Sequence, residues 1–270
     1  NVGIAKGISI DGNLAEADIN NAGKVVVENL AKIRNKYNVV DENIFVVASS
    51  GVALAQNTQS LIDKIKVLTN KELDFITADT EGKMLLKGSI PPTEYNDAII
   101  LDIGGGNTKG GYVDVLNDNK FEFFPLKLDF GTITLTEAIN KTIVIPREME
   151  DMQVYNEKAF NYAPLLREKI TEMLSTKPMS LQKKKIYLSG GAVWAFVTLY
   201  YNNPSEDHFI PLKMEDIMNY DAILKNNFSK YENLAKTGKD AEKVLSTYGQ
   251  KHLIGGNSIL IACLESIPNL

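Results

Sequence analysis

The segment LDIGGGNTKGG carries the residue types of an anion-binding loop. An apolar run that ends at Asp102 is followed by three glycines and three polar residues, Gly104, Gly105, Gly106, Asn107, Thr108 and Lys109. Consecutive glycines turn the chain tightly and let phosphate oxygens approach the backbone amides, to which the polar side chains would add hydrogen bonds. Asp102 is placed to hold a hydrated divalent cation. The alternative is that the glycines have no ligand and only allow the close packing of a tight hairpin. The loop matches neither a Walker loop nor a dinucleotide-binding fingerprint.

Two other positions offer groups for phosphate chemistry. Glu81 begins a predicted helix, where a carboxylate would orient an attacking water during hydrolysis of a phosphoanhydride. An acidic residue in a first helical turn is also favoured by the helix dipole without any catalytic purpose. Ser49 and Ser50 end the apolar run NIFVVA, where small residues bind a phosphate or simply pack.

Two glycine pairs precede apolar runs later in the chain. Gly190 and Gly191, in YLSGGAVWAF, would contact an adenine, bind a phosphate, or only allow a tight connection between a strand and a helix. The pair in LIGGNSILIACLE is open to the same alternatives and predicts a glycine turn that opens the last helix.

The hydrophobic pattern predicts the elements that position these residues. Apolar residues three or four positions apart predict helices at 17–36, 58–70, 81–90, 134–140, 156–174, 213–224 and 232–236. Asp18 or Asn20 is the expected cap of the first. Short β-branched runs predict strands in NIFVVA, DFITA, AIILDI, GGYVDVL, KFEFFPLKL and KKKIYL. A polar turn at 117–119 makes an antiparallel hairpin of two of these strands. The alternation of strands and helices, with a hairpin, favours an α/β fold with mixed sheets over a pure Rossmann fold.

The composition excludes several classes of protein. The 270 residues include 29 basic and 34 acidic side chains, one cysteine and two histidines. One cysteine cannot form an intramolecular disulfide, which favours a reducing compartment and predicts a cytoplasmic protein. The acidic balance argues against DNA binding, and the apolar runs are too short to cross a membrane. The densest basic run, Lys183 to Lys185, is expected to form a solvated face, with steering of a polyanion as the alternative.

The order and spacing of seven segments resemble one known family. They are KGISIDGNLAEADINNAGKVVVENLAKI, VVASSGVALAQN, ITADTEGKMLLKG, LDIGGGNTKGG, LDFGTITLTE, YLSGGAVWAF and LIGGNSILIACLE. Together they resemble the exopolyphosphatase/guanosine pentaphosphate phosphohydrolase (Ppx/GppA) family, over almost the whole chain. That family belongs to the superfamily of actin, sugar kinases and heat-shock ATPases.

The resemblance implies a two-lobed actin-like, ribonuclease H-type fold. We expect a first lobe of residues 1–95 plus 256–270 and a second lobe of 96–255, with the site residues in the cleft between them. It further implies a hydrolase that releases terminal phosphate from polyphosphate or a phosphorylated guanosine nucleotide. In this role Glu81 would orient the water, Asp102 would hold Mg²⁺ or another divalent cation, and the remaining candidates would bind phosphate. A homodimer is left open.

Several departures from the family pattern keep other functions open. The family's arginine in the VVASSG segment is Ala53 here, the acidic neighbour of the catalytic glutamate is Thr80, and the glutamate that closes the phosphate loop is Lys109. Lys109 would replace the arginine clamp, displace a cation, or point into solvent. The family's first phosphate hairpin is expected to precede Asn1, and the chain is expected to lack the C-terminal extension of longer members. A catalytically impaired protein that binds phosphate or nucleotide is therefore the first alternative, and a kinase of the same superfamily is the second.

Overall fold

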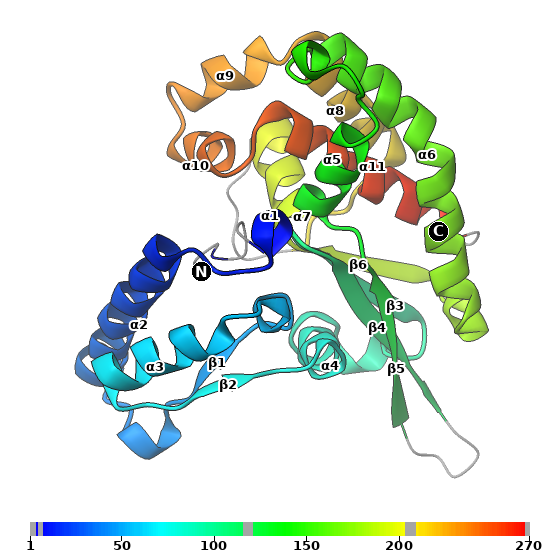
Figure 1. Ribbon diagram of the computed structural model, residues 1–270. Helices are drawn as coiled ribbons and strands as arrows, with labels where there is room; N and C mark the ends of the chain where they lie inside the picture. Colours follow the sequence, from blue (N-terminus) through cyan, green and yellow to red (C-terminus); the bar gives the residue numbers. More distant parts are fainter. Residues whose placement is uncertain (1–3, 5–7, 116–120, 203–208, 268–270) are drawn as a thin grey trace. The chain divides into compact units, whose positions relative to one another are not determined.

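The structure is a computed structural model that describes residue 4 and residues 8–115, 121–202 and 209–267. The chain forms two compact units, Asn1–Glu81 and Gly82–Leu270 (Figure 1). The expected mixed α/β class is confirmed, whereas the boundary lies nearer the N-terminus than the expected one. Within the described residues, no helix is long and apolar enough to cross a membrane.

The first unit is built around a short parallel pair of strands. The strands β1 (Val46–Ala48) and β2 (Leu73–Phe75) pair in register, with Val46 opposite Leu73. The helices are α1 (Ile8–Asp11), α2 (Glu16–Tyr37) and α3 (Thr58–Thr69), and α4 (Ala78–Ser89) begins in this unit and continues into the next. Ala15 rather than Asp18 or Asn20 stands at the N-cap of α2, without a side-chain hydrogen bond, so the expected cap is wrong.

The second unit contains a mixed four-stranded sheet in the order β5-β4-β3-β6. The strands are β3 (Ala98–Ile103), β4 (Thr108–Val115), β5 (Phe121–Leu128) and β6 (Lys185–Ser189). The central strand β3 is antiparallel to β4 and parallel to β6. The expected pairing of β4 with β5 is confirmed, and the turn expected at 117–119 lies outside the described residues.

Both faces of this sheet are covered, which explains why β3 is apolar at every position except Asp102. Side chains alternate along a strand, so Ala98 and Ile100 pack on one face, with Leu86 of α4. Ile99, Leu101 and Ile103 join the large core on the other face.

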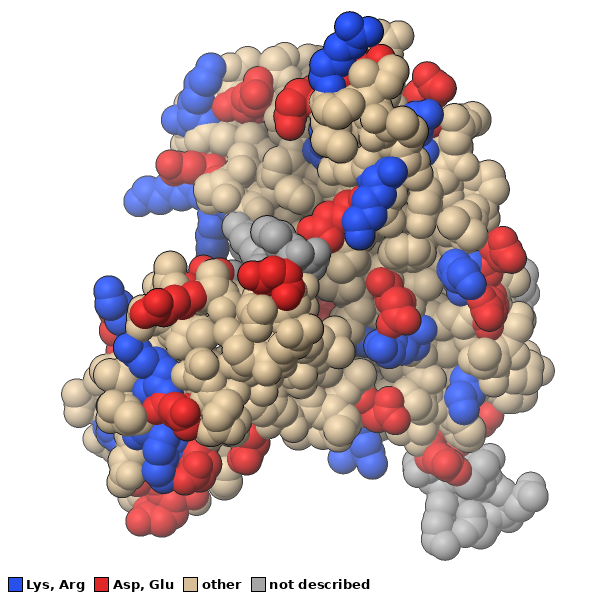
Figure 2. All heavy atoms as spheres, in the orientation of Figure 1, with Lys and Arg blue, Asp and Glu red and all other residues tan. Residues whose placement is uncertain are grey.

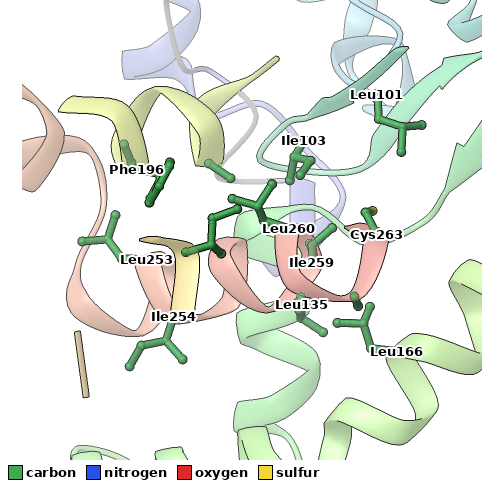
Figure 3. Close-up of a cluster of buried hydrophobic side chains, with 14 of the residues drawn as sticks. Leu101, Ile103, Leu135, Leu166, Phe196, Leu253, Ile254, Ile259, Leu260 and Cys263 are labelled. Carbon is green, nitrogen blue, oxygen red and sulfur yellow. The ribbon is translucent and has the colours of Figure 1, made fainter. Parts of the chain in front are cut away.

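That large core is enclosed by α5 (Thr132–Asn140), α6 (Met152–Ser175), α7 (Gly191–Phe196), α8 (Met214–Asn226), α9 (Ser229–Ala235), α10 (Lys239–Thr247) and α11 (Gln250–Ser266). Figure 3 shows Leu260 and Cys263 of α11 among side chains from β3, α5 and α6. The Cys263 thiol is fully buried, as expected, and burial raises its pKa to about 12.

Two expectations about the last helix are corrected. Gly255 and Gly256 form no turn but lie inside α11, where they allow close packing: a Cβ on Gly255 would lie 2.6 Å from Thr136 Oγ1, and one on Gly256 would lie 3.0 Å from the Ala192 Cβ. Because α11 packs against α5, α6, α7 and α8, it belongs to the second unit rather than to the first, where we had expected it.

The basic run before β6 is not one solvated face. Lys183 is only 3% exposed, and its ammonium donates to the carbonyls of Asn96 at 2.7 Å and Val113 at 2.9 Å. Burial lowers the pKa of Lys183. Lys184 and Lys185 do reach the surface.

Candidate functional site

The glycine loop connects β3 to β4 and is attached to the first turn of α5. Backbone amides of that turn donate to the carbonyl oxygens of Gly104 and Gly105, each at 2.8 Å. The hydroxyl of Thr134 donates to the carbonyl oxygen of Gly106 at 2.9 Å. All three glycine carbonyls therefore face α5.

The direction of these carbonyls fixes the direction of the loop amides. In a planar trans peptide, the C=O group and the following N–H group point in opposite directions. No cis peptide bond occurs among the described residues. The N–H groups of Gly105, Gly106 and Asn107 consequently point away from α5. Three successive amides on one side of a loop form the kind of nest that binds anionic oxygens.

Gly131, directly before α5, makes this attachment geometrically feasible. A Cβ at this position would lie 2.5 Å from the carbonyl oxygen of Gly104 and 2.6 Å from the nitrogen of Asn107. Its backbone dihedrals, φ −127° and ψ −175°, suit any residue, so close approach rather than conformation requires glycine here. The amide of Gly131 also donates to the Thr134 hydroxyl at 2.9 Å.

The polar residues after the glycines are largely enclosed. Thr108 is 0% exposed, and its hydroxyl donates to the carbonyl oxygen of Phe130 at 2.9 Å, so this side chain holds the end of the loop in place. Asn107 is 7% exposed. The loop thus offers a ligand its backbone amides more than these two side chains.

A row of polar residues crosses the sheet beside the loop. The register places Ser189 of β6 opposite Asp102 of β3, Asp102 opposite Lys109 of β4, and Lys109 opposite Lys127 of β5. Directly opposed residues share a face, which here is the α4 face, because Asp102 continues the alternation of Ala98 and Ile100. The Lys109 ammonium lies 3.9 Å from Asp102 Oδ2, and Lys109 is 7% exposed. Lys109 therefore does not point into solvent.

The glycine turn after β6 is tightly packed. Gly190 has φ 98°, a conformation that favours glycine, and a Cβ there would lie 2.4 Å from Asp102 Oδ1. A Cβ on Gly191 would lie 2.0 Å from the phenolic oxygen of Tyr248. Burial, followed by the negative charge of Asp102, raises the pKa of Tyr248. Packing against Asp102 and Tyr248 thus explains both glycines.

In the first unit, Ser50 holds the carboxylate of Glu81. The backbone N–H of Ser50 donates to Glu81 Oε2 at 3.1 Å, and its hydroxyl donates to the same oxygen at 2.9 Å. Thr77 caps α4 by accepting from the Thr80 amide at 3.1 Å, which sets Glu81 on the first turn of that helix. Ser49 is partly buried and its carbonyl oxygen accepts from the Val52 amide at 3.0 Å.

The residues around Asp102 fit a magnesium ion poorly. Mg²⁺ takes six oxygen ligands in nearly ideal octahedral geometry, of which a protein commonly supplies only one or two carboxylates beside water and substrate phosphate. Asp102 Oδ2 lies 3.9 Å from the Lys109 ammonium, which would repel a cation bound to the same carboxylate, and a Cβ on Gly190 would lie 2.4 Å from Oδ1. Within the described part of the chain, no three His, Cys, Asp or Glu side chains gather to hold a metal ion.

A protein-family comparison matches residues 1–194 to the model described as the Ppx/GppA phosphatase family. The chain belongs to this family. The match includes β1, the Glu81 helix, the glycine loop and the Gly190–Gly191 turn, all of which lie in segments that carried the resemblance. The last of the seven segments, LIGGNSILIACLE, lies beyond the matched residues. No curated protein matches the sequence significantly.

Solved Ppx/GppA structures have the same fold. A family member from Aquifex aeolicus is 20% identical, with a TM-score of 0.67 over 98% of this chain and 79% of that chain. An exopolyphosphatase-like protein gives a TM-score of 0.70 at 15% identity, over 98% and 79% of the two chains. An exopolyphosphatase from Cytophaga hutchinsonii gives 0.61 at 16% identity, over 99% and 79%. The expected actin-like fold of the family is confirmed.

Three residues of the site were not singled out by the sequence analysis. Gly131 and Thr134 attach the glycine loop to α5, and Tyr248 covers the turn at Gly191. The segment LDFGTITLTE contains the first two, and its glycine is a residue type favoured at helix N-caps, which is a weak signal of a helix start. Nothing in the sequence around Tyr248 marks its contact with a turn 57 residues earlier, because only tertiary packing brings the two together.

Proposed function

We propose that this phosphatase-family chain hydrolyses the terminal phosphoanhydride bond of polyphosphate or of guanosine penta- or tetraphosphate. The observation that carries the proposal is the pair of hydrogen bonds from Ser50 to Glu81, which fixes one carboxylate oxygen from two directions. A carboxylate held in this way is preorganised to orient a water molecule and accept its proton.

The proposed reaction is an in-line displacement by water. The water oxygen forms a bond to the terminal phosphorus, its proton passes to Glu81, and the bridging P–O bond breaks toward the shortened chain. The amides of Gly105, Gly106 and Asn107 would stabilise charge on the phosphoryl oxygens, which is the main task of a protein in phosphoryl transfer. The shared cleft between two lobes stays a prediction, as does a homodimer.

The charge distribution favours short or nucleotide-linked phosphate chains. The sequence carries a net charge of -5. On the face shown in Figure 2, lysine and arginine side chains are interspersed with aspartate and glutamate rather than joined into a continuous basic track. A very long polyanion would gain little from such a surface.

The test is phosphate release by the full chain from polyphosphate and, separately, from pppGpp, each in EDTA and in MgCl₂. We expect turnover of at least one substrate and a loss of about 10²- to 10⁴-fold in Glu81→Gln, the range typical of a general base. Glu72→Gln is the matched control, because Glu72 is an exposed glutamate of the same unit whose carboxylate pairs with Lys66. Full activity in Glu81→Gln would remove the assigned role of Glu81.

A binding protein without turnover is the second candidate. The observation in its favour is that Thr80, which replaces the family's acidic residue, has its hydroxyl engaged by Thr77 at 2.9 Å. Phosphate or nucleotide binding without hydrolysis by the unmodified chain would support this candidate and contradict the first. Transfer of phosphate from ATP to acetate or a sugar would favour the kinase alternative.

A further inference from the structure

We propose that the glycine loop binds its phosphate without a divalent cation, and that the Lys109 ammonium, held on Asp102, supplies the positive charge instead. This inference rests on the proposed function for the choice of a phosphate chain as ligand. It adds the means by which the charge of that chain is neutralised.

The first support is the position of Lys109. It lies directly opposite Asp102 in the β3–β4 ladder, one residue beyond Thr108 at the end of the glycine loop. Its side chain is 9% exposed and its ammonium is 3.9 Å from Asp102 Oδ2. A long flexible side chain that is this enclosed stays beside Asp102, at the end of the strand that leads into the loop, so its charge is fixed there rather than spread through solvent.

The second support is the environment of Asp102. A cation bound to Oδ2 would share one carboxylate with an ammonium group, and two positive charges at that separation repel strongly in a partly buried site. A Cβ on Gly190 would lie only 2.4 Å from Oδ1, so the backbone of that turn runs close to the second oxygen. A cation at Asp102 would therefore compete with the Lys109 ammonium, and the nearby backbone limits the room for its octahedral shell of ligands.

The third support is the kind of charge beside the loop. The Lys109 side chain carries a full positive charge, and the three loop amides add partial positive charge toward a ligand. A phosphate that approaches would therefore meet an ammonium and a nest of N–H groups. The ammonium would bind phosphate as a point charge, as the lysine of a P-loop does.

The experiment measures binding, so that it does not depend on turnover. Tripolyphosphate is titrated calorimetrically into the full chain and its variants, with EDTA and then with MgCl₂. Unmodified protein is expected to bind in EDTA, with less than about a threefold change on addition of Mg²⁺, a difference well below 1.4 kcal/mol. Lys109→Gln is expected to weaken binding in EDTA by at least about tenfold. Lys109→Arg, which keeps the charge, is expected to bind within about threefold of the unmodified protein.

Two further variants complete the test. Lys184→Gln removes an equal charge from an exposed lysine that pairs with Asp97 at the opposite end of the sheet, and is expected to bind normally. Lys109→Glu places two carboxylates on facing strands and is expected to gain Mn²⁺ binding, detected by the loss of the free-ion electron paramagnetic resonance signal. Thermal unfolding monitored by circular dichroism verifies that each variant is folded.

The outcomes separate this inference from the proposed function. Binding that requires Mg²⁺ in the unmodified protein, or equal binding in EDTA by folded Lys109→Gln, would overturn the role of Lys109. Metal-independent, Lys109-dependent binding without any phosphate release would support this inference while contradicting the hydrolase proposal.

Discussion

The hydroxyl of Thr134 lies 2.9 Å from the carbonyl oxygen of Gly106 and joins the tip of the glycine loop to helix α5. The hydroxyl oxygen of Thr134 in turn accepts a hydrogen bond from the amide of Gly131 at 2.9 Å. One small side chain thus ties the loop to the helix start. The direction of the Asn107 amide, which a phosphate would meet, depends on this link.

Replacement of Thr134 by valine is expected to loosen the loop. Valine keeps the shape of threonine but can neither donate to Gly106 nor accept from Gly131, and loss of the link to Gly106 is expected to weaken the affinity for tripolyphosphate about tenfold. Because two hydrogen bonds are lost, the free energy of unfolding should fall by about 1–3 kcal/mol. Calorimetric titration and urea unfolding measure the two effects. Thr142→Val is the control, because its hydroxyl donates to the Ile139 carbonyl at the other end of α5. Unchanged affinity in Thr134→Val would refute the link.

A methyl group at Gly131 is expected to displace the loop. Its carbon would lie 2.5 Å from Gly104 O and 2.6 Å from Asn107 N, which are backbone atoms with little freedom to move. Gly131→Ala should destabilise the chain by about 1–3 kcal/mol, as overpacking does, and should abolish phosphate binding. Gly88→Ala, in α4 with no atom within 4 Å of the new Cβ, should instead be neutral or stabilising. Urea unfolding and calorimetry compare the two, and equal behaviour of both variants would contradict the close approach.

Removal of the Ser50 hydroxyl is expected to affect turnover more than substrate binding. Ser50→Ala removes the 2.9 Å hydrogen bond to Glu81 Oε2 but leaves the 3.1 Å bond from the backbone amide. If Glu81 orients the water, kcat should fall about tenfold, because one of two orienting bonds is lost, with KM nearly unchanged. Steady-state phosphate release measures both constants. A rise in KM alone would show that Ser50 binds substrate instead.

Alkaline pH is expected to destabilise the second unit through its buried tyrosines. Tyr155 is 0% exposed, and burial raises its pKa from 10.0 to about 12. Between these values the unfolded chain binds fewer protons than the native chain, so the free energy of unfolding falls as the pH rises. Tyr155→Phe should reduce this slope by up to about 1.4 kcal/mol per pH unit. Urea unfolding at several pH values above 10.0 measures it. An unchanged slope would show that Tyr155 does not contribute.

Much of the local structure followed from the sequence. The apolar periodicity placed α2 and α3 to within one residue at each end, because an amphipathic helix repeats its buried face every 3.6 residues. The β-branched run AIILDI is β3, as expected. The pattern failed at Gly255 and Gly256, where two glycines in a helix serve contacts with Thr136 and Ala192 that lie far away in the sequence.

The candidate site was predictable only in part. The glycine loop and Glu81 stood out because their residue types and surroundings indicate phosphate chemistry. The partners of these residues did not stand out. The sequence predicts Ser50 as a phosphate ligand, whereas the structure shows its hydroxyl bound to Glu81. A hydrogen bond between residues 31 positions apart produces no periodic pattern in the sequence.

The sequence by itself determined the class of fold, the order of the elements, the family and the loop that turns through three glycines. Local propensity and hydrophobic spacing act over a few residues, so they can be recognised from the sequence without a structure. Only the tertiary structure decided where the charges and carbonyls point. It encloses Lys109 against Asp102 and turns the carbonyls of the glycine loop toward α5, because sheet register and helix packing set these directions.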